Sequence, residues 1–220
     1  MTTNSLRVAP ANTADFRLLA QKRLPLQLFD YIDGGSYQET TLANNLKAFS
    51  QLSLRQKILR DVSQIDISCK LFKDSLNMPL ILAPIGLAGC YAKRGEIQAL
   101  KAANKHNIPF CLSTVGICSI EELQAKAYEE FWFQLYVIKD RSYSLSLLKR
   151  AEQAGCKTLI LTVDLPVLAE RYRDIRNGLS SSEMRSTLLG KFKRGFDIVS
   201  HPSWVWDVAI NGKPLTFGNL

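Results

Sequence analysis

The chain has 220 residues, of which 46% are hydrophobic and 22% charged, and its formal net charge is +8. This is the composition of an ordinary globular protein able to bury a core, and it excludes an intrinsically disordered chain. Lysine and arginine are spread along the whole sequence without any nucleic-acid-binding motif, so we expect no nucleic-acid partner.

The five cysteines are odd in number and form no C-x-x-C pair. Such a scattered set favours reduced thiols in the cytoplasm over a disulfide framework or a zinc site, so we predict no metal centre. The first sixteen residues lack the apolar core of a signal peptide. Residues 75–92 are uncharged but contain prolines and glycines, which favours a buried strand with a glycine-rich loop over a membrane helix.

Residues 14–52 repeat apolar side chains at intervals of three and four, which predicts helices. The pattern stops at Gly34 and Gly35 and resumes at Thr40 or Thr41. In the mixed segment that follows, ISCKLF precedes the turn-like KDSLN, which is typical of a hairpin. We therefore expect residues 1–78 to form an N-terminal segment of helices and one hairpin.

From residue 79 onward, short apolar strands alternate with helical segments. The strands are predicted to begin near Pro79, Ile108, Phe131 and Thr158. The helices are predicted over residues 95–107, 119–128 and 141–155, the second opening with the capping box Ser119–Glu122. Strands at this period with intervening helices indicate βα units and a parallel sheet. Because neither G-x-G-x-x-G nor G-x-x-x-x-G-K-[ST] occurs, a (β/α) barrel is favoured over a dinucleotide-binding or P-loop fold.

Alternation along the third and fourth strands sorts their side chains onto two faces. The face predicted to meet the helices carries Phe133, Leu135, Val137, Leu159, Leu161 and Val163. The opposite face carries Trp132, Gln134, Tyr136, Ile160, Thr162 and Asp164. Burying the Gln134 amide without partners would cost about 1–3 kcal/mol, so protein groups or a polar ligand must take up its hydrogen bonds.

Polar residues collect at the carboxyl ends of these strands, the rim where active sites of (β/α) barrels lie. The alternative is that they merely mark transitions from strand to loop. An amide both donates and accepts, which suits a flat heterocycle with alternating donors and acceptors. Pro84, Ile85 and Gly86, after the first strand, would let the backbone approach such a ring closely.

Residues 165–220 do not continue the alternation of strands and helices. A segment of this length before a fifth strand is expected to be a long loop or lid. Within it, residues 190–196 place three cations among two phenylalanines, and Trp204 and Trp206 follow. Such a segment can rest on an anionic bilayer surface, and the alternative is a solvated loop.

Six motifs occur in order along the chain: FDYIDGG (29–35), APIGLAG (83–89), AKRGE (92–96), LSTV (112–115), WFQLY (132–136) and LTVDLPVLAERYRD (161–174). Together they resemble the FMN-dependent α-hydroxy-acid dehydrogenases, which include glycolate oxidase, mandelate dehydrogenase and the respiratory L-lactate dehydrogenases. HPSWVWDVAINGKP (201–214) is most similar to the lactate dehydrogenase branch. One departure is Ala169, where the family more often has glycine.

The resemblance implies a (β/α)8 TIM barrel, FMN as the cofactor and a small 2-hydroxy acid as the substrate. The flavin contacts that it implies are Pro84, Ile85, Gly86, Ser113, Gln134 and Thr162. The substrate contacts that it implies are Tyr31, Tyr136 and Arg171. The implied reaction oxidises L-lactate to pyruvate, with a quinone or another acceptor reoxidising the flavin. The full-length form that the resemblance implies is a homo-oligomer. From its cysteines and from residues 190–196, the protein is expected in the cytoplasm with a peripheral contact to the inner face of the cell membrane.

The family's histidine base and arginine, in an SNHGGRQ-type motif, and its strand-five lysine are not in these 220 residues. His106 and His201 match no catalytic position, so the base is expected beyond residue 220. Because a full barrel takes ~250 residues, we expect one incomplete domain that is inactive alone.

This domain would comprise the N-terminal segment 1–78, the first four barrel strands 79–164 and a long loop or lid 165–220. The alternatives are a non-catalytic truncated remnant or the complementing half of a split enzyme. A flavin isomerase is disfavoured by the carboxylate-binding pair Tyr31 and Arg171.

Overall fold

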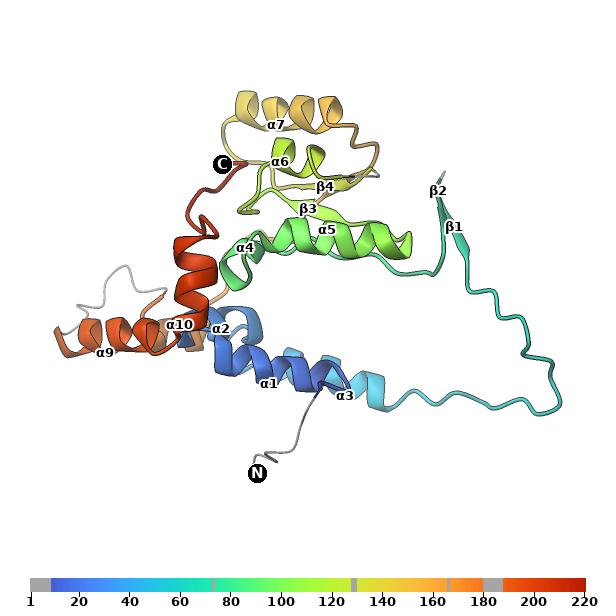
Figure 1. Cartoon of the computed structure of the whole chain (residues 1–220), viewed down its shortest axis with the longest axis horizontal. Coiled ribbons are helices and arrows are strands. Elements are labelled where there is room, and N and C mark those ends of the chain that lie inside the picture. Colours follow the sequence, from blue (N-terminus) through green and yellow to red (C-terminus); the bar gives the residue numbers. More distant parts are fainter. Residues whose placement is uncertain (1–8, 73, 128–129, 166, 180–187) are drawn as a thin grey trace. The chain divides into compact units, whose positions relative to one another are not determined.

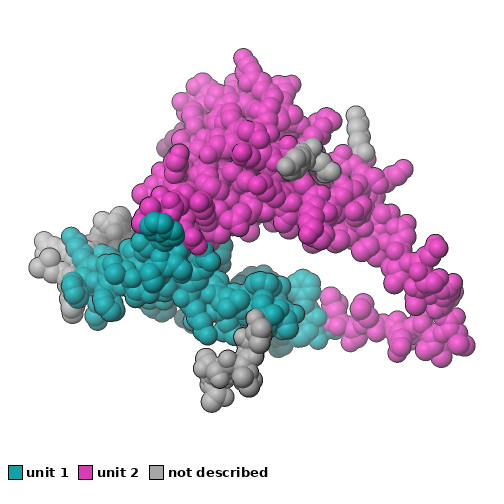
Figure 2. Space-filling model, viewed as in Figure 1, with its two compact units in different colours: residues 1–51, 169–206 teal, residues 52–168, 207–220 magenta. Residues whose placement is uncertain are grey.

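The computed structural model describes residues 9–72, 74–127, 130–165, 167–179 and 188–220, and Figure 1 labels its helices and strands. The chain divides into two compact units, coloured in Figure 2. Unit 1 comprises residues 1–51 and 169–206, and unit 2 comprises residues 52–168 and 207–220. The single domain with boundaries at residues 78 and 164 stays a prediction.

The described part of unit 1 is built from helices and their connecting loops. The helices are α1 (Thr13–Arg23), α2 (Leu26–Asp33), α3 (Thr40–Ser50), α8 (Tyr172–Asn177), α9 (Leu188–Val199) and α10 (Pro202–Trp204), and the π-helix η1 (Val205–Ile210) leads into unit 2. α1 begins where the Asn12 side chain accepts a hydrogen bond from the Asp15 backbone N–H at 3.0 Å. α2 is followed by Gly34 as its C-cap and α3 begins at Thr40, as predicted.

Helices occupy much of the segment that was expected to be a long loop. α8, α9, α10 and η1 all lie within residues 165–220. Glycines and serines favour a loop here, but Phe192, Phe196 and Val199 recur at the spacing of one helix face. Residues 190–196 lie inside α9, so they form a helix and not a loop. Their contact with a bilayer stays a prediction.

Unit 2 contains a hairpin and a parallel sheet. The hairpin pairs β1 (Cys69–Leu71) with β2 (Asp74–Leu76) antiparallel, as predicted. The sheet has the strand order β3 (Cys111–Ser113), β4 (Trp132–Leu135), β5 (Leu159–Leu161), and both pairings are parallel. In its register Ser113 lies beside Gln134, and Gln134 lies beside Ile160. The carboxyl ends of the three strands therefore lie at the same end of the sheet.

The first predicted strand is reduced to one parallel bridge, between Leu82 and Phe110. The Leu82 N–H donates to the Pro109 carbonyl at 2.9 Å, and the Cys111 N–H donates to the Leu82 carbonyl at 3.0 Å. Prolines flank this segment on both sides, and because proline has no N–H the ladder cannot extend far.

Three helices pack on one face of the sheet. They are α5 (Gly95–His106), α6 (Ile120–Gln124) and α7 (Arg141–Gln153), with the short α4 (Ala88–Tyr91) before α5. Leu100, Leu123 and Leu147, one from each helix, are fully buried and cluster with Phe133 and Leu135 of β4. Phe133 and Leu135 therefore meet the helices, as predicted.

The outer face of β5 differs from the prediction. Leu159, Leu161 and Val163 were expected to pack against helices, but they are 46%, 51% and 81% exposed. Val137, expected on the same face after β4, is 46% exposed. These residues lie on or beside the edge strand of a three-stranded sheet, where fewer neighbours are available to cover them.

The end of the chain supports the start of α6. Ser119 and Glu122 form the predicted capping box. Asn219 is fully buried, and its Oδ1 accepts a hydrogen bond from Ile120 N at 2.9 Å. Its Nδ2 donates to the Cys118 carbonyl at 3.1 Å. The end of the β3–α6 loop next to α6 is thus held both by the capping box and by the Asn219 side chain.

Candidate functional site

The buried amide of Gln134 bonds to hydroxyl groups of the two neighbouring strands. Gln134 lies in β4 and is 2% exposed. Its Oε1 accepts from Ser113 Oγ at 3.0 Å, and its Nε2 donates to Thr162 Oγ1 at 2.8 Å. Ser113 ends β3 and Thr162 directly follows β5, so three adjacent strands bring these side chains together. We call Ser113, Gln134 and Thr162 the amide–hydroxyl cluster.

The amide–hydroxyl cluster keeps hydrogen-bonding capacity for a ligand. The second amide proton of Gln134 and the hydroxyl proton of Thr162 are donors that the bond between these residues does not use. Ser113 Oγ accepts from Val115 N at 3.3 Å and retains one more acceptor lone pair. The cluster therefore offers both donors and an acceptor, which fits the pyrimidine edge of a flavin.

Thr114 locks β3 to β4 and was not among the predicted site residues. It is fully buried, its N–H donates to the Gln134 carbonyl at 3.0 Å, and its Oγ1 donates to the same oxygen at 2.6 Å. Thr114 Oγ1 also accepts from Tyr136 N at 3.1 Å. The LSTV motif contains Thr114, but a threonine at a strand end looks the same in sequence whether it contacts a ligand or the backbone.

The loop before α4 contains Pro84, Ile85 and Gly86, which were predicted to lie against a ring. Gly86 has no room for a side chain, because a Cβ there would lie 2.7 Å from Val115 Cγ2. Leu87 N–H donates to the Val115 carbonyl at 3.0 Å. The loop is therefore held against the loop that follows β3, while Ile85 remains half-exposed.

Arg171 and Tyr31 lie together in unit 1, although 140 residues separate them. Arg171 Nη2 donates to the carbonyls of Tyr31 and of Gly34, the latter at 3.0 Å. The guanidinium carbon lies 4.8 Å from the centroid of the Tyr31 ring. Arg171 Nε lies 2.8 Å from a carboxylate oxygen of Asp174, which is 3% exposed. Asp174 was not predicted as a site residue, yet it holds the arginine in place.

An ionic network ties α8 to the helix that carries Tyr31. Arg173 Nη1 lies 2.9 Å from Asp33 Oδ2, and its Nη2 lies 2.6 Å from Glu39 Oε2. Arg17 Nη2 donates to Asp33 Oδ2 at 2.8 Å. The Arg17 hydrogen bond lowers the pKa of Asp33, and the Arg173 hydrogen bond lowers the pKa of Glu39. These pairs connect α1, α2, α8 and the start of α3.

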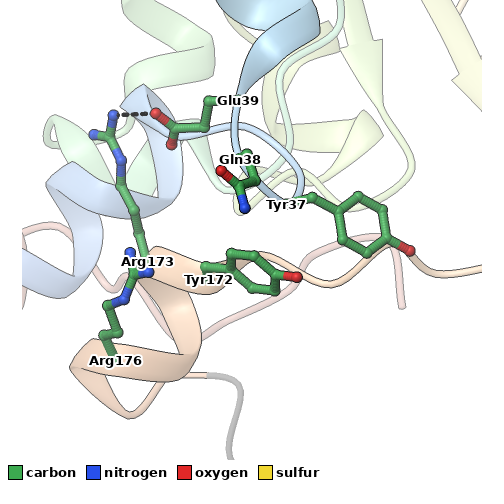
Figure 3. Close-up of a pocket in the computed structure, with 6 residues that line it drawn as sticks. All are labelled: Tyr37, Gln38, Glu39, Tyr172, Arg173 and Arg176. Atoms are coloured by element: carbon green, nitrogen blue, oxygen red, sulfur yellow. Dashed lines mark hydrogen bonds and ion pairs between the residues drawn. The ribbon is translucent and has the colours of Figure 1, made fainter.

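A partly open pocket of about 280 Å³ lies beside this network in unit 1 (Figure 3). It is lined by Tyr37, Gln38, Glu39, Tyr172, Arg173 and Arg176. The Tyr37 and Tyr172 rings meet edge to face, with centroids 5.9 Å apart. Glu39 and Arg173 are paired with each other, so the remaining lining consists of two tyrosine rings, the Gln38 amide and the Arg176 guanidinium. Tyr172 and Arg173 belong to the motif LTVDLPVLAERYRD (161–174), but no binding role was predicted for them.

Tyr136, the third predicted substrate contact, belongs to unit 2 and is half-buried just after β4. Tyr31 and Arg171 belong to unit 1. The roles of all three toward a substrate stay predictions, as do the flavin contacts of the amide–hydroxyl cluster.

Known proteins are similar to this chain in sequence. The pattern of a family described as FMN-dependent dehydrogenase matches residues 20–217. An L-lactate dehydrogenase of Alcaligenes faecalis is 46% identical over 210 residues, which cover 96% of this chain and 54% of the relative. An L-lactate dehydrogenase of Actinobacillus pleuropneumoniae serotype 3 (strain JL03) is 47% identical over 210 residues, with the same coverage.

Among solved structures, the crystal structure of the monotopic membrane protein (S)-mandelate dehydrogenase matches with a TM-score of 0.82 at 35% identity. The match covers 91% of this chain and 52% of that chain. It confirms the predicted fold class, since the parallel sheet and its helices form part of a (β/α)8 barrel family fold. The chain spans about half the length of the curated relatives it matches.

Proposed function

The chain belongs to the family of FMN-dependent dehydrogenases, and on this premise we propose that the whole protein oxidises an L-2-hydroxy acid with FMN as its cofactor. The substrate we propose is L-lactate, which would yield pyruvate, because two relatives at 46% and 47% identity are L-lactate dehydrogenases. When bound, FMN accepts the two electrons that leave the substrate. The observation that carries the proposal is the amide–hydroxyl cluster.

The residues that would hold the flavin all lie in unit 2: Pro84, Ile85, Gly86, Ser113, Gln134 and Thr162. The cluster would bind the polar edge of the ring, because the free amide proton of Gln134 and the Thr162 hydroxyl can donate to carbonyl oxygens. The loop before α4 would supply the surface on which the ring lies. Thr114 would keep the cluster in register by tying β3 to β4.

In unit 1, Tyr31 is proposed to hold the substrate carboxylate and Arg171 to lie at the substrate entrance, since a carboxylate suits a phenol and a guanidinium. In unit 2, Tyr136 is proposed as a second tyrosine that faces the substrate. Arg171 Nη2 already donates to the Tyr31 and Gly34 carbonyls, which presents its guanidinium beside the Tyr31 ring. The reduced flavin would pass its electrons to a quinone or another acceptor. We propose a homo-oligomer for the whole protein, in line with the family resemblance.

The 220-residue chain, assayed alone, is proposed to bind FMN weakly and to leave it oxidised in the presence of L-lactate. Its two histidines are engaged elsewhere: His106 lies in the last turn of α5, and His201 Nδ1 lies 2.7 Å from the Asp197 carbonyl. The test is an FMN titration followed by flavin fluorescence, then anaerobic addition of L-lactate. Absence of FMN binding would contradict the cofactor proposal, and flavin bleaching would contradict the proposed inactivity.

A second candidate function is that of one half of a two-chain enzyme, in which a partner chain would pair with the edge strand β5. Leu159 and Leu161 are half-exposed beside an open strand edge, a surface that can pair with a further strand. Co-expression with a polypeptide that carries the family's NHGGR motif should restore lactate-dependent flavin reduction. Two chains that purify separately and stay inactive would count against this candidate.

We also propose that α9 lies on an anionic membrane surface. Phe192, Phe196 and Val199 share one face and are each at least 70% exposed. Lys191 and Lys193 lie about 100° to either side of Phe192 around the helix, where ammonium groups reach lipid phosphates. A membrane surface suits an exposed apolar face flanked by cations. The (S)-mandelate dehydrogenase that matches this chain is described as a monotopic membrane protein. Within the described part of the chain, no helix is long and apolar enough to span a bilayer.

Co-sedimentation with anionic vesicles tests this contact. Replacing Lys191, Lys193 and Arg194 by glutamate should abolish binding, because cations attract the chain to anionic lipid. The matched control replaces three exposed lysines of unit 2 (Lys101, Lys105 and Lys149) by glutamate, and it should retain most of the binding. Equal losses in the two variants would point to net charge alone and contradict a role for α9.

A further inference from the structure

One buried carboxylate joins the two loops of unit 2 that carry the proposed flavin contacts. Glu96 is the second residue of α5 and is 1% exposed. Its Oε1 accepts hydrogen bonds from Gly89 N at 3.1 Å and from Ile117 N at 2.8 Å. The negative charge lies in the first turn of α5, where the helix dipole stabilises it. The two bonds join α4, which follows the loop of Pro84–Gly86, to the loop that follows β3.

The space around this carboxylate is closely fitted. A Cβ at Gly89 would lie 2.6 Å from Ile117 Cβ and 3.1 Å from Glu96 Oε2. A Cβ at Gly95 would lie 2.5 Å from the Ala88 carbonyl oxygen. Gly89 therefore permits the backbone to approach the carboxylate closely, and Gly95 permits the start of α5 to approach the backbone of α4. A shorter side chain than glutamate would not reach both N–H groups at once.

Besides these two N–H groups, the buried Cys118 thiol is a hydrogen-bonding neighbour of the Glu96 carboxylate. Arg94, two residues earlier, forms its ion pair with Glu122. Burial, and then the charge of Glu96, raises the pKa of the nearby Cys90 thiol to about 11, so this neighbour is neutral at pH 7. The backbone pair Leu87 N to Val115 O, at 3.0 Å, links the same two loops at a second point.

We infer that Glu96 is a positioning residue for flavin binding, which fixes the spacing between the loop of Pro84–Gly86 and the end of β3 at Ser113. Gly89 lies three residues after Gly86, and Ile117 lies four residues after Ser113, so the bridge acts close to both sets of contacts. The inference rests on the proposed function, because the two loops are assigned to FMN there. Neither the AKRGE motif nor the flavin contacts suggested by resemblance assign this role to the glutamate.

The test compares Glu96→Gln with Glu96→Met in the full 220-residue chain. Glutamine keeps the accepting oxygen, so FMN affinity should stay within about threefold of the unchanged chain, whereas methionine has similar length and no acceptor for the two N–H groups. Loss of these bonds should weaken FMN binding by about tenfold or more. Leu147→Ala serves as the stability control, since Leu147 is fully buried on the helix side of the sheet.

Amide hydrogen exchange in the flavin-free chain gives a readout that does not depend on FMN. Gly89 and Ile117 should exchange slowly in the unchanged chain and in Glu96→Gln, and rapidly in Glu96→Met. Unchanged protection in Glu96→Met would overturn the bridge, and an equal loss of FMN affinity in Leu147→Ala at matched stability would overturn the positioning role. If the unchanged chain binds no FMN, the proposed function fails, whereas the exchange rates still decide whether Glu96 holds the loops together.

Discussion

The two units bring polar side chains together in different ways. In unit 2, Ser113, Gln134 and Thr162 come from three adjacent parallel strands, and their contacts follow from the register of the sheet. In unit 1, Tyr31 and Arg171 come from segments 140 residues apart, and ion pairs and carbonyl contacts hold them. The cluster in unit 2 therefore depends on buried hydrogen bonds, and the pair in unit 1 depends on charge.

Because of this difference, the two units should respond differently to substitutions, to pH and to salt. A buried amide that loses its partners leaves polar groups without hydrogen bonds, which is costly at any pH. A network of half-buried ion pairs weakens when its carboxylates are protonated or when salt screens them. Substitutions in unit 2 should thus act on flavin binding and stability together, and those in unit 1 should depend on solution conditions.

The largest effect is expected for Gln134→Leu. Leucine fills similar space but offers no donor or acceptor, so the buried Ser113 hydroxyl loses its bond. We expect a loss of about 1–3 kcal/mol in the free energy of unfolding and of at least about tenfold in FMN affinity. Urea unfolding and flavin fluorescence measure the two quantities.

Gln124→Leu is the matched control, because Gln124 is exposed at the end of α6 and donates to the Gln153 carbonyl. Its changes in the free energy of unfolding and in the free energy of FMN binding should be only a few tenths of those expected for Gln134→Leu. If both variants bind FMN equally well, the amide–hydroxyl cluster does not contact the flavin.

A smaller effect is expected for Arg173→Met. The side chains of Asp33 and Glu39 are 11% and 23% exposed, and the variant leaves Glu39 without its ion pair while Asp33 keeps Arg17. We expect a loss of about 1–2 kcal/mol, between the values for exposed and buried pairs. The control Arg176→Met removes an exposed arginine that contacts the Tyr172 ring, and it should cost less. Equal costs would show that the network adds nothing to unit 1.

The pH dependence of the free energy of unfolding should also differ between substitutions in the two units. The pKa of Asp33 and of Glu39 is lowered from the ordinary 3.8 and 4.5 by the bonds to Arg17 and Arg173. A lowered pKa contributes stability that is complete above the ordinary value and is lost as the pH falls through the folded value. The stability gap between the unchanged chain and Arg173→Met should therefore shrink as the pH falls below about 4.5.

The same pH series with Glu121→Gln addresses unit 2. The hydrogen bond from Arg150 lowers the pKa of Glu121 to about 2, but the Glu121 side chain is 55% exposed, so solvent screens the pair. Its stability gap should be smaller than that of Arg173→Met at neutral pH. A gap for Arg173→Met that stays constant from pH 7 to about pH 3 would contradict the ionic account of unit 1.

The sheet and its cluster could be predicted from the sequence because alternation is local. Because side chains alternate along a strand, Gln134 and Thr162 were predicted on the same face of the sheet. The regular spacing of the strands indicated that their strands are neighbours. The capping box of α6 and the glycine at the end of α2 are equally local signals, and the structure confirms both. Burial on β5 was mispredicted, because exposure at a sheet edge depends on what lies beside the strand.

Other features needed information that a local pattern does not contain. Tyr31 and Arg171 were linked only by resemblance to a family, since no periodicity connects residues so far apart. Glu96 and Asp174 are charged residues that sequence alone places on the surface, yet both are buried because backbone N–H groups or an arginine pair with them. α9 was expected as part of a loop, because its glycines obscured the helical spacing of its apolar residues.

The most direct test of the central claim is NMR of the Gln134 side-chain amide during an FMN titration of the 220-residue chain. The account predicts that these amide resonances shift in step with FMN binding, because the free proton of Gln134 donates to the flavin ring. Amide resonances of Gln134 that stay in place while FMN is fully bound would contradict it.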